Sequence, residues 1–166
     1  MNTTQLNPNQ IITLNDYPVY SNQVLRKYLN QCISGINIPL VPVIREDFVK
    51  EHFDDDLLNK FEIFRAENPN AKYFMLDGSH RTTALTLVDS EIGVMIYETD
   101  EDIDQARKLV ATGQICKNGT LNHTLEENCV MLSKHFGRKP GFMTVTQKTK
   151  KMAEENVLPL GISYLN

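Results

Sequence analysis

The chain has 166 residues, of which 41% are hydrophobic and 23% are charged. This length suits one domain with a core of its own, and no apolar run approaches the roughly 20 residues that span a bilayer. Seventeen basic and twenty-one acidic residues give a formal net charge of −4, which argues against a general electrostatic grip on nucleic acid or on an anionic membrane.

The cysteines and the N-terminus indicate the compartment. Cys32, Cys116 and Cys129 are widely spaced and form no C-x-x-C pair of the kind that holds zinc or a redox dithiol. The N-terminus, MNTTQLNPNQ, is polar and lacks the basic start and apolar centre of a signal peptide. We therefore expect a cytoplasmic protein with no membrane partner, and the sequence leaves its oligomeric state open.

The first predicted elements are a strand and an amphipathic helix. QIITL, residues 10–14, is a candidate strand, and NDYPVY follows as an extended or turning segment. Apolar residues between 24 and 33 then fall on one helical stripe, with Asn22 as a candidate cap and Gly35 as a natural stop.

A strongly apolar strand comes next, INIPLVPVI at residues 36–44. Its two prolines lack amide donors, so we expect it either at an edge of the sheet or with irregular pairing. One or two helices are then predicted before the Asn-Pro-Asn turn at 68–70. The carboxylates of Asp54, Asp55 and Asp56 are either the solvated start of a helix or, less often, a binding site for a divalent cation.

Later segments add a strand and three helices. EIGVMIYE, residues 91–98, reads as a buried strand, and the next helix has Thr99 and Asp102 in capping-box spacing. A second capping box, Thr124 with Glu127, opens a helix that we expect to end at Gly137. A last helix carries a basic stretch at Lys148, Lys150 and Lys151, which either contacts nucleic acid or a polyphosphate or, more often for such runs, is a solvated face.

The segment YFMLDGSHRTTALTL, residues 73–87, predicts a strand, a tight turn at Gly78 and a helix. The first amides of a helix lack intrahelical acceptors and carry the positive end of its dipole, so they attract anions. Ser79, His80, Arg81, Thr82 and Thr83 would add donors, and a phosphate fits this pattern. The alternative is that Asp77 and Ser79 only cap the helix, Arg81 forms a surface ion pair and His80 packs locally.

The same segment resembles the ParB/sulfiredoxin superfamily, whose members place a Gly-x-His/Arg-Arg-x-x-Ala motif between a strand and a helix. Here the motif is Gly78 to Ala84, and the resemblance covers residues 10–112. It implies an α+β domain, a small mixed sheet with packed helices, that grips nucleotide phosphates. Residues 1–112 would form this domain and residues 113–166 a C-terminal helical extension that packs on it. The Walker P-loop, G-x-G-x-x-G, G-x-S-x-G and H-E-x-x-H motifs are all missing from the sequence.

Members of the superfamily use different nucleotides. Sulfiredoxins use ATP and need a cysteine where Ser79 stands, which excludes their chemistry here. Partition proteins bind CTP, and they have an arginine where His80 stands and a helix-turn-helix DNA-binding domain further on. Their likeness implies a nucleotide-gated switch that binds nucleic acid, and we keep this function as the alternative.

The free serine kinases, which use ADP, share an Asp-Gly-x-His-Arg core, and Asp77 to Arg81 match every fixed position of it. The likeness implies that Arg81 and the amides at Gly78 to Thr83 hold phosphate oxygens and that His80 hydrogen-bonds a phosphate. Asp77 would bind Mg²⁺ or lie near the acceptor hydroxyl. These kinases also use a glutamate base before the first helix, and Asp16 is the only carboxylate that could replace it. We therefore expect ATP, ADP or CTP as the nucleotide, Mg²⁺ as the metal, and phosphoryl transfer to a small hydroxylated metabolite such as free serine.

Overall fold

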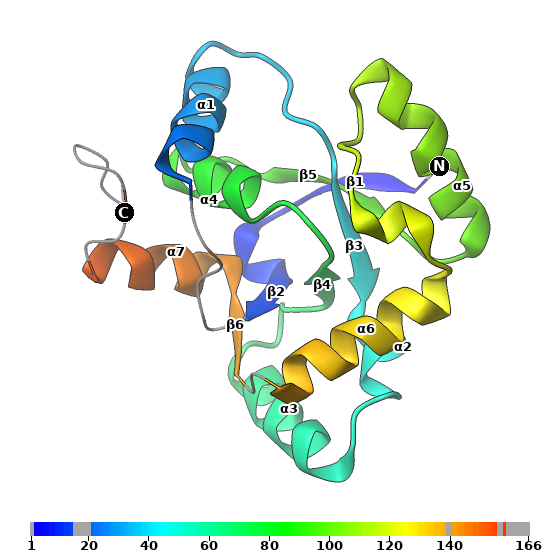
Figure 1. Cartoon of the computed structure of the whole chain (residues 1–166). Helices are drawn as coiled ribbons and strands as arrows, with labels where there is room; N and C mark the ends of the chain where they lie inside the picture. The colour runs from blue at the N-terminus through cyan, green and yellow to red at the C-terminus, as the bar shows by residue number, and fades with distance from the viewer. Residues whose placement is uncertain (1, 15–20, 139–140, 156–157, 159–166) are drawn as a thin grey trace.

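A computed structural model of the chain describes residues 2–14, 21–138, 141–155 and 158. They form a mixed sheet with helices on both faces (Figure 1), so the expected α+β class with a small mixed sheet and packed helices is confirmed. Among these described residues, no helix is both long enough and apolar enough to cross a bilayer.

Six strands make up the sheet within the described residues, in the order β1-β5-β3-β4-β2-β6. The β1–β5, β3–β4 and β2–β6 pairs are antiparallel, and the β3–β5 and β2–β4 pairs are parallel. The strands are β1 (Thr3–Leu6), β2 (Ile11–Leu14), β3 (Val41–Arg45), β4 (Tyr73–Met75), β5 (Ile92–Ile96) and β6 (Phe142–Thr144).

The helices divide between the two faces of the sheet, as Figure 1 shows. α1 (Asn22–Ile33), α4 (Ser79–Leu87) and α7 (Val145–Glu154) cover one face. The other face carries α2 (Glu46–Lys50), α3 (Asp55–Glu67), α5 (Asp100–Leu109) and α6 (Leu125–Arg138). Three short 3₁₀ helices connect these elements, η1 (Pro8–Gln10), η2 (Val110–Thr112) and η3 (Gly119–Asn122).

Alternating side chains along the strands build a core on each face. Ile11 and Val43 point to the α1, α4 and α7 side, whereas their neighbours Ile12 and Ile44 point to the other side. The second core is centred on six phenylalanine rings whose centroids lie 4.8 to 6.3 Å apart. They are Phe53, Phe61, Phe64, Phe74, Phe136 and Phe142.

Of the two expectations for residues 36–44, a place at the sheet edge is wrong, because β3 lies between β5 and β4, and irregular pairing is left as the way the prolines are accommodated. The carbonyl of Pro42 accepts from the amide of Leu76 at 3.0 Å, so the proline nitrogen also faces the β4 side. There it lies opposite Leu76, just beyond the last residue of β4. The missing amide hydrogen of Pro42 therefore removes only the last hydrogen bond between β3 and β4, at the point where the chain turns into Asp77 and Gly78.

The expected caps mark most helix starts. Asp54 Oδ1 accepts from the Leu57 amide at 2.8 Å, so this carboxylate caps α3. The capping boxes at Thr99 and Thr124 are both present. Helix α1 is capped by Ser21, one residue before the predicted Asn22, because the Ser21 hydroxyl accepts from the amide of Val24.

The described part of residues 113–166 does more than pack on the domain as an extension. Strand β6, which the sequence did not reveal, pairs with β2 and extends the sheet. Helix α6 places Phe136 against Phe74 and Phe142 in the aromatic core. Strand β1, in the polar lead, was also unpredicted and pairs with β5 at the opposite edge.

This packing makes the stability of the domain depend on α6. We expect Phe136→Ala to lower the free energy of unfolding by about 3–5 kcal/mol, because it removes a buried ring and leaves a cavity. Met131→Ala, on the same helix but half-exposed, is the control and should cost less than about 1 kcal/mol. Urea unfolding followed by circular dichroism measures both. A small cost for Phe136→Ala, or a separate transition for the C-terminal segment, would contradict this packing.

Candidate functional site

The strand, glycine turn and helix that the motif predicts are all present. Strand β4 ends at Met75, and α4 begins at Ser79 with Gly78 as its N-cap. Gly78 has φ 113° and ψ 30°, a left-handed conformation that favours glycine. Because Gly78 has no side chain, α4 has no side-chain cap, unlike α1, α3, α5 and α7.

Close packing is a second reason for glycine at this position. A Cβ at Gly78 would lie 3.1 Å from Arg81 Nη2 and 3.3 Å from Val41 Cγ2. The guanidinium of Arg81 therefore passes directly against the turn, and a larger residue would displace it.

Arg81 lies beneath the turn with only 2% of its surface exposed. Its Nη1 donates to the carbonyl oxygens of Pro39 at 3.1 Å and Leu40 at 2.8 Å, and its Nη2 donates to Asp77 Oδ2 at 2.9 Å. These bonds tie the turn to the segment that leads into β3. They give Arg81 a positioning role. Because Arg81 is buried, its pair with Asp77 is not the surface ion pair of the alternative, and its expected contact with phosphate stays a prediction.

Thr82 and Thr83 also point inward, and both are buried. The Thr82 hydroxyl donates to the Gly78 carbonyl at 2.9 Å, and the Thr83 hydroxyl donates to the Ser79 carbonyl at 2.8 Å. Threonine in a helix commonly bonds the carbonyl four residues earlier, which the sequence argument overlooked. Their hydroxyls therefore brace the first turn of α4 from the protein side.

His80 connects the start of α4 to the start of α1. Its Nε2 accepts from the backbone amide of Ser21 at 3.0 Å. Burial and the charge of Lys148 lower the pKa of His80, while Asp77 raises it. The ring is therefore neutral at pH 7, with its proton on Nδ1.

Lys148 does not lie on a solvated face, which was one of the two expectations for the basic stretch. Only 2% of its surface is exposed, whereas Lys150 is exposed, and the other expectation, contact with nucleic acid or a polyphosphate, stays a prediction. The signal was in the sequence: Lys148 shares the helical spacing of Val145, Thr149 and Met152, all of them buried. Lys148 is close enough to His80 for its charge to lower the histidine pKa, and so it brings a buried cation toward the first turn of α4.

Asp77 lies at the front of the turn, with 40% of its side chain exposed. Oδ2 pairs with Arg81, and Oδ1 forms no hydrogen bond with another described residue. Within the part of the chain that the structure describes, no group of three His, Cys, Asp or Glu side chains is arranged to hold a metal. The other expected catalytic carboxylate, Asp16, lies outside the described residues.

A cavity of about 390 Å³, which we call the Asp77 cavity, opens beside this turn. Two of the residues that line it, Asp77 and Thr120, act on the pKa of Tyr97, which is fully buried and has a hydroxyl without a hydrogen-bond partner among the described residues. Burial raises the pKa of Tyr97 to about 12. Thr120 is the neighbour that most opposes this shift, but its hydroxyl does not form a hydrogen bond with Tyr97. The Tyr97 hydroxyl is therefore protonated. The cavity is lined by Leu76, Asp77, Asn118, Gly119, Thr120, Asn128, Met131, Leu132, Lys134, His135 and Arg138.

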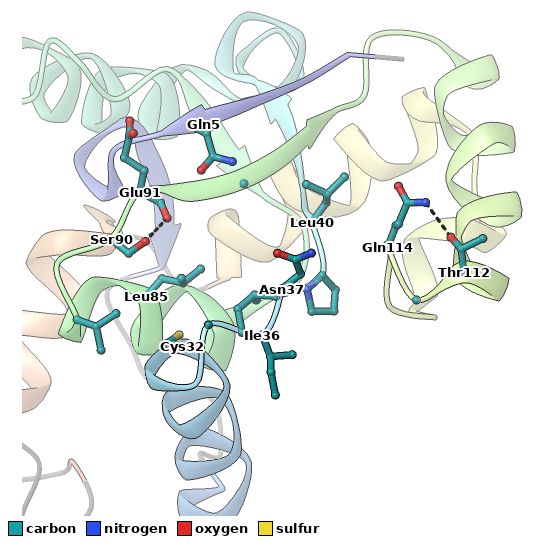
Figure 2. Close-up of a pocket in the computed structure, with 16 residues that line it drawn as sticks. Gln5, Cys32, Ile36, Asn37, Leu40, Leu85, Ser90, Glu91, Thr112 and Gln114 are labelled. Carbon is teal, nitrogen blue, oxygen red and sulfur yellow. Dashed lines mark hydrogen bonds between the residues drawn. The ribbon is translucent and has the colours of Figure 1, made fainter.

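Figure 2 shows a larger cavity, of about 840 Å³, at the far ends of α1 and α4. Within the part of the chain that the structure describes, none of the predicted site residues lines it, and Glu91 is the only charged residue in its wall. Two of its polar pairs, Ser90 with Glu91 and Gln114 with Thr112, are hydrogen-bonded to each other. This cavity is less suited to an anionic ligand than the region around Asp77.

Comparison with family models, with curated proteins and with solved structures found no match to this chain. The resemblance of residues 77–84 to the ParB/sulfiredoxin superfamily therefore stays a prediction.

The geometry of the turn gives a test of its own. We expect Gly78→Ala to lower the free energy of unfolding by about 1–3 kcal/mol, because alanine is strained at a φ of 113° and its Cβ would crowd Arg81. Gly119→Ala is the matched control and should change stability by no more than about 0.5 kcal/mol, since nothing lies within 4 Å of the added Cβ. Chemical denaturation compares the two. Equal stability of both variants would mean that the turn does not have this conformation.

Proposed function

We propose that this protein binds the phosphates of a nucleotide at the amino end of α4 and transfers a phosphoryl group to a small hydroxylated metabolite. One observation carries the proposal, the buried Lys148 beside His80 at the first turn of α4. The likeness of Asp77 to Arg81 to the free serine kinases suggests the same location.

Electrostatics at this helix end favour an anion. The amino end of α4 carries the positive end of the helix dipole, and its N-cap is a glycine without a side chain to cap it. The charge of Lys148 adds to this positive potential and already lowers the pKa of His80. A polyphosphate placed here would be attracted by the helix dipole and by the charge of Lys148.

Each motif residue then has a distinct task. In this proposal the amides of Ser79 and His80 and the Lys148 ammonium bind phosphate oxygens. Arg81 acts as a positioning residue, because its bonds to Pro39, Leu40 and Asp77 hold the turn open to the ligand. ATP, ADP and CTP all carry the polyphosphate that this site would recognise.

Asp77 suits a magnesium site completed by the nucleotide. Mg²⁺ is commonly held by one or two carboxylates together with substrate phosphates and water. Asp77 offers Oδ1, the oxygen that does not pair with Arg81. A single protein carboxylate is consistent with the lack of a three-residue metal cluster among the described residues.

The transfer step follows from this arrangement. The acceptor hydroxyl oxygen bonds to the terminal phosphorus, and the bond from that phosphorus to the bridging oxygen breaks. The electron pair of that bond leaves on the shortened nucleotide, and the hydroxyl proton passes to a carboxylate base and then to water. Asp16 stays the prediction for that base, and it lies outside the described residues.

The alternative, a nucleotide-gated switch that binds nucleic acid, has less support. In partition proteins a separate DNA-binding unit follows the nucleotide domain. Here α6 buries Phe136 in the aromatic core, and α7 buries Val145 in the core on the opposite face. Both helices are therefore parts of the domain itself.

Loss of the buried lysine tests the phosphate site. We expect Lys148→Met to weaken ATP binding about 10- to 100-fold in titration calorimetry, because it removes a charge-assisted contact and keeps the length of the side chain. Lys150→Met, an exposed neighbour on the same helix, should stay within about twofold of the wild type. A similar affinity for both variants, with both folded by circular dichroism, would refute the site.

A second variant tests the chemistry separately. We expect Asp77→Asn to lower phosphoryl transfer by about 10²- to 10⁴-fold, since a neutral amide binds Mg²⁺ less well than a carboxylate does. Nucleotide affinity should change little, because asparagine keeps an oxygen that accepts from Arg81. The assay is mass spectrometry of hydroxylated metabolites incubated with Mg²⁺ and ATP or ADP. Full turnover in this variant would remove Asp77 from the mechanism.

A further inference from the structure

The cavity of Figure 2 has polar groups whose hydrogen-bonding direction is fixed. The Thr112 hydroxyl donates its one hydrogen to the Leu109 carbonyl at 2.9 Å, so it accepts from Gln114 Nε2, 3.1 Å away. This bond sets the amide of Gln114 and turns its Oε1 away from Thr112, as Figure 2 shows. The Ser90 hydroxyl donates to the Glu91 carbonyl at 2.9 Å, so its oxygen offers lone pairs alone. Gln114, Ser90 and the Glu91 carboxylate are therefore three acceptors in the wall of one cavity.

The charge of this wall is negative. Glu91 is exposed, and among the described residues it is the only charged side chain that lines the cavity. It forms no ion pair with any residue in the described ranges. Burial raises the pKa of the Cys32 thiol, which also lines the cavity, so this group is uncharged at pH 7. A ligand that has a positive charge and hydrogen-bond donors matches this wall, and an anion does not.

The cavity lies where the sheet opens. Strand β5 begins at Ile92, but its pairing with β3 begins at Val94, opposite Val41. Before Val41 the chain leaves β5, and Arg81 donates to the carbonyl oxygen of Pro39 at 3.1 Å. The start of β5 and the segment before β3 therefore border the cavity without pairing with each other. The cavity follows from the course of the backbone and does not depend on one side-chain rotamer.

Apolar side chains separate the acceptors. Leu85 and Val88 of α4 and Leu40 before β3 line the cavity. In Figure 2, Glu91 lies on one side of the cavity and Gln114 on the other. The volume of about 840 Å³ is within the range of about 300–1,000 Å³ that small-molecule sites have. A ligand that matches this cavity therefore has an apolar middle and a polar group at each end.

We infer that the cavity of Figure 2 binds a small aliphatic amine that carries a second hydrogen-bond donor at its far end. The ammonium group pairs with Glu91 and donates to Ser90 Oγ. The carbon chain packs on Leu85 and Val88, and the second donor bonds to Gln114 Oε1. The inference goes beyond the proposed function and does not rest on it, because the cavity lies at the opposite end of α4 from the proposed phosphate site.

Four probes with the same five-carbon chain test the inference by NMR titration of the full chain. Aminopentanol, substituted at its two ends, has both the ammonium group and the second donor. Pentylamine lacks the second donor, pentanediol lacks the charge, and hydroxypentanoate reverses it. We expect aminopentanol to bind about tenfold more tightly than pentanediol and about threefold more tightly than pentylamine, and hydroxypentanoate not to bind. The methyl groups of Leu85 and Val88 should shift, and that of Met131 in the Asp77 cavity should not.

Two variants assign the two ends of the ligand. Glu91→Gln keeps the shape of the side chain and removes its charge, so aminopentanol should bind no more tightly than pentanediol does. Its control, Glu67→Gln, removes the same charge from an exposed position at the end of α3 and should bind like the wild type. Gln114→Met should remove the preference for aminopentanol over pentylamine and leave pentylamine affinity within about twofold. Circular dichroism checks that all three variants fold.

The outcomes decide the inference independently of nucleotide binding. The expected order of the four probes, with its loss in Glu91→Gln, would sustain the amine site even if the protein bound no ATP. No binding of aminopentanol, equal binding of the four probes, or an unchanged order in Glu91→Gln would overturn it. A shift at Met131 without one at Leu85 would also overturn it, because the amine would then lie in the other cavity. If Glu91→Gln did not fold, the order of the probes on the wild type would decide alone.

Discussion

The guanidinium of Arg81 donates to the carbonyl oxygens of Pro39 and Leu40 and to the carboxylate of Asp77, and so joins two segments that are distant in sequence, the β4–α4 turn and the segment that leads into β3. Because the group is buried, losing one partner would leave a charge or a carbonyl unpaired, which makes this arrangement costly to rearrange. The left-handed turn at Gly78 gives the guanidinium room to pass. The shape of the turn and the direction of Asp77 therefore depend on one side chain.

The two sides of this turn differ in chemistry. On one side, burial and the charge of Lys148 lower the pKa of His80, whose Nε2 accepts from the Ser21 amide. On the other side, the Asp77 cavity is bordered by Lys134 and Arg138 of α6.

The sequence predicted the parts of the fold that depend on local pattern. Apolar periodicity located β4, α4 and α1, and capping boxes marked the starts of α5 and α6. The sequence alone did not predict strand pairs that are distant along the chain. Strand β1 is short and polar, and β6 is short and flanked by glycine. They become strands only because β5 and β2 offer free edges. The central place of β3 was missed because the cost of Pro42 depends on where β4 ends. Pro42 removes only the last hydrogen bond between β3 and β4, and the sequence does not show where that pairing stops.

The candidate site was predicted in place but not in detail. The glycine turn and the helix start are where the motif puts them, since both depend on residues next to each other. The directions of Arg81, Thr82 and Thr83 depend on the carbonyl groups around them, and a charged or hydroxylated residue in a sequence carries no sign of whether it faces ligand or protein. Lys148 was missed for the opposite reason, because a basic run suggests solvent although its helical spacing indicates burial.

A crystal structure of the protein with Mg²⁺ and a non-hydrolysable ATP analogue tests the central claim most directly. The account predicts phosphate oxygens within about 3.2 Å of the Ser79 and His80 amides and of the Lys148 ammonium, with Mg²⁺ between a phosphate and Asp77. Triphosphate density in the cavity of Figure 2 or along α6, with the first turn of α4 unoccupied, would contradict it.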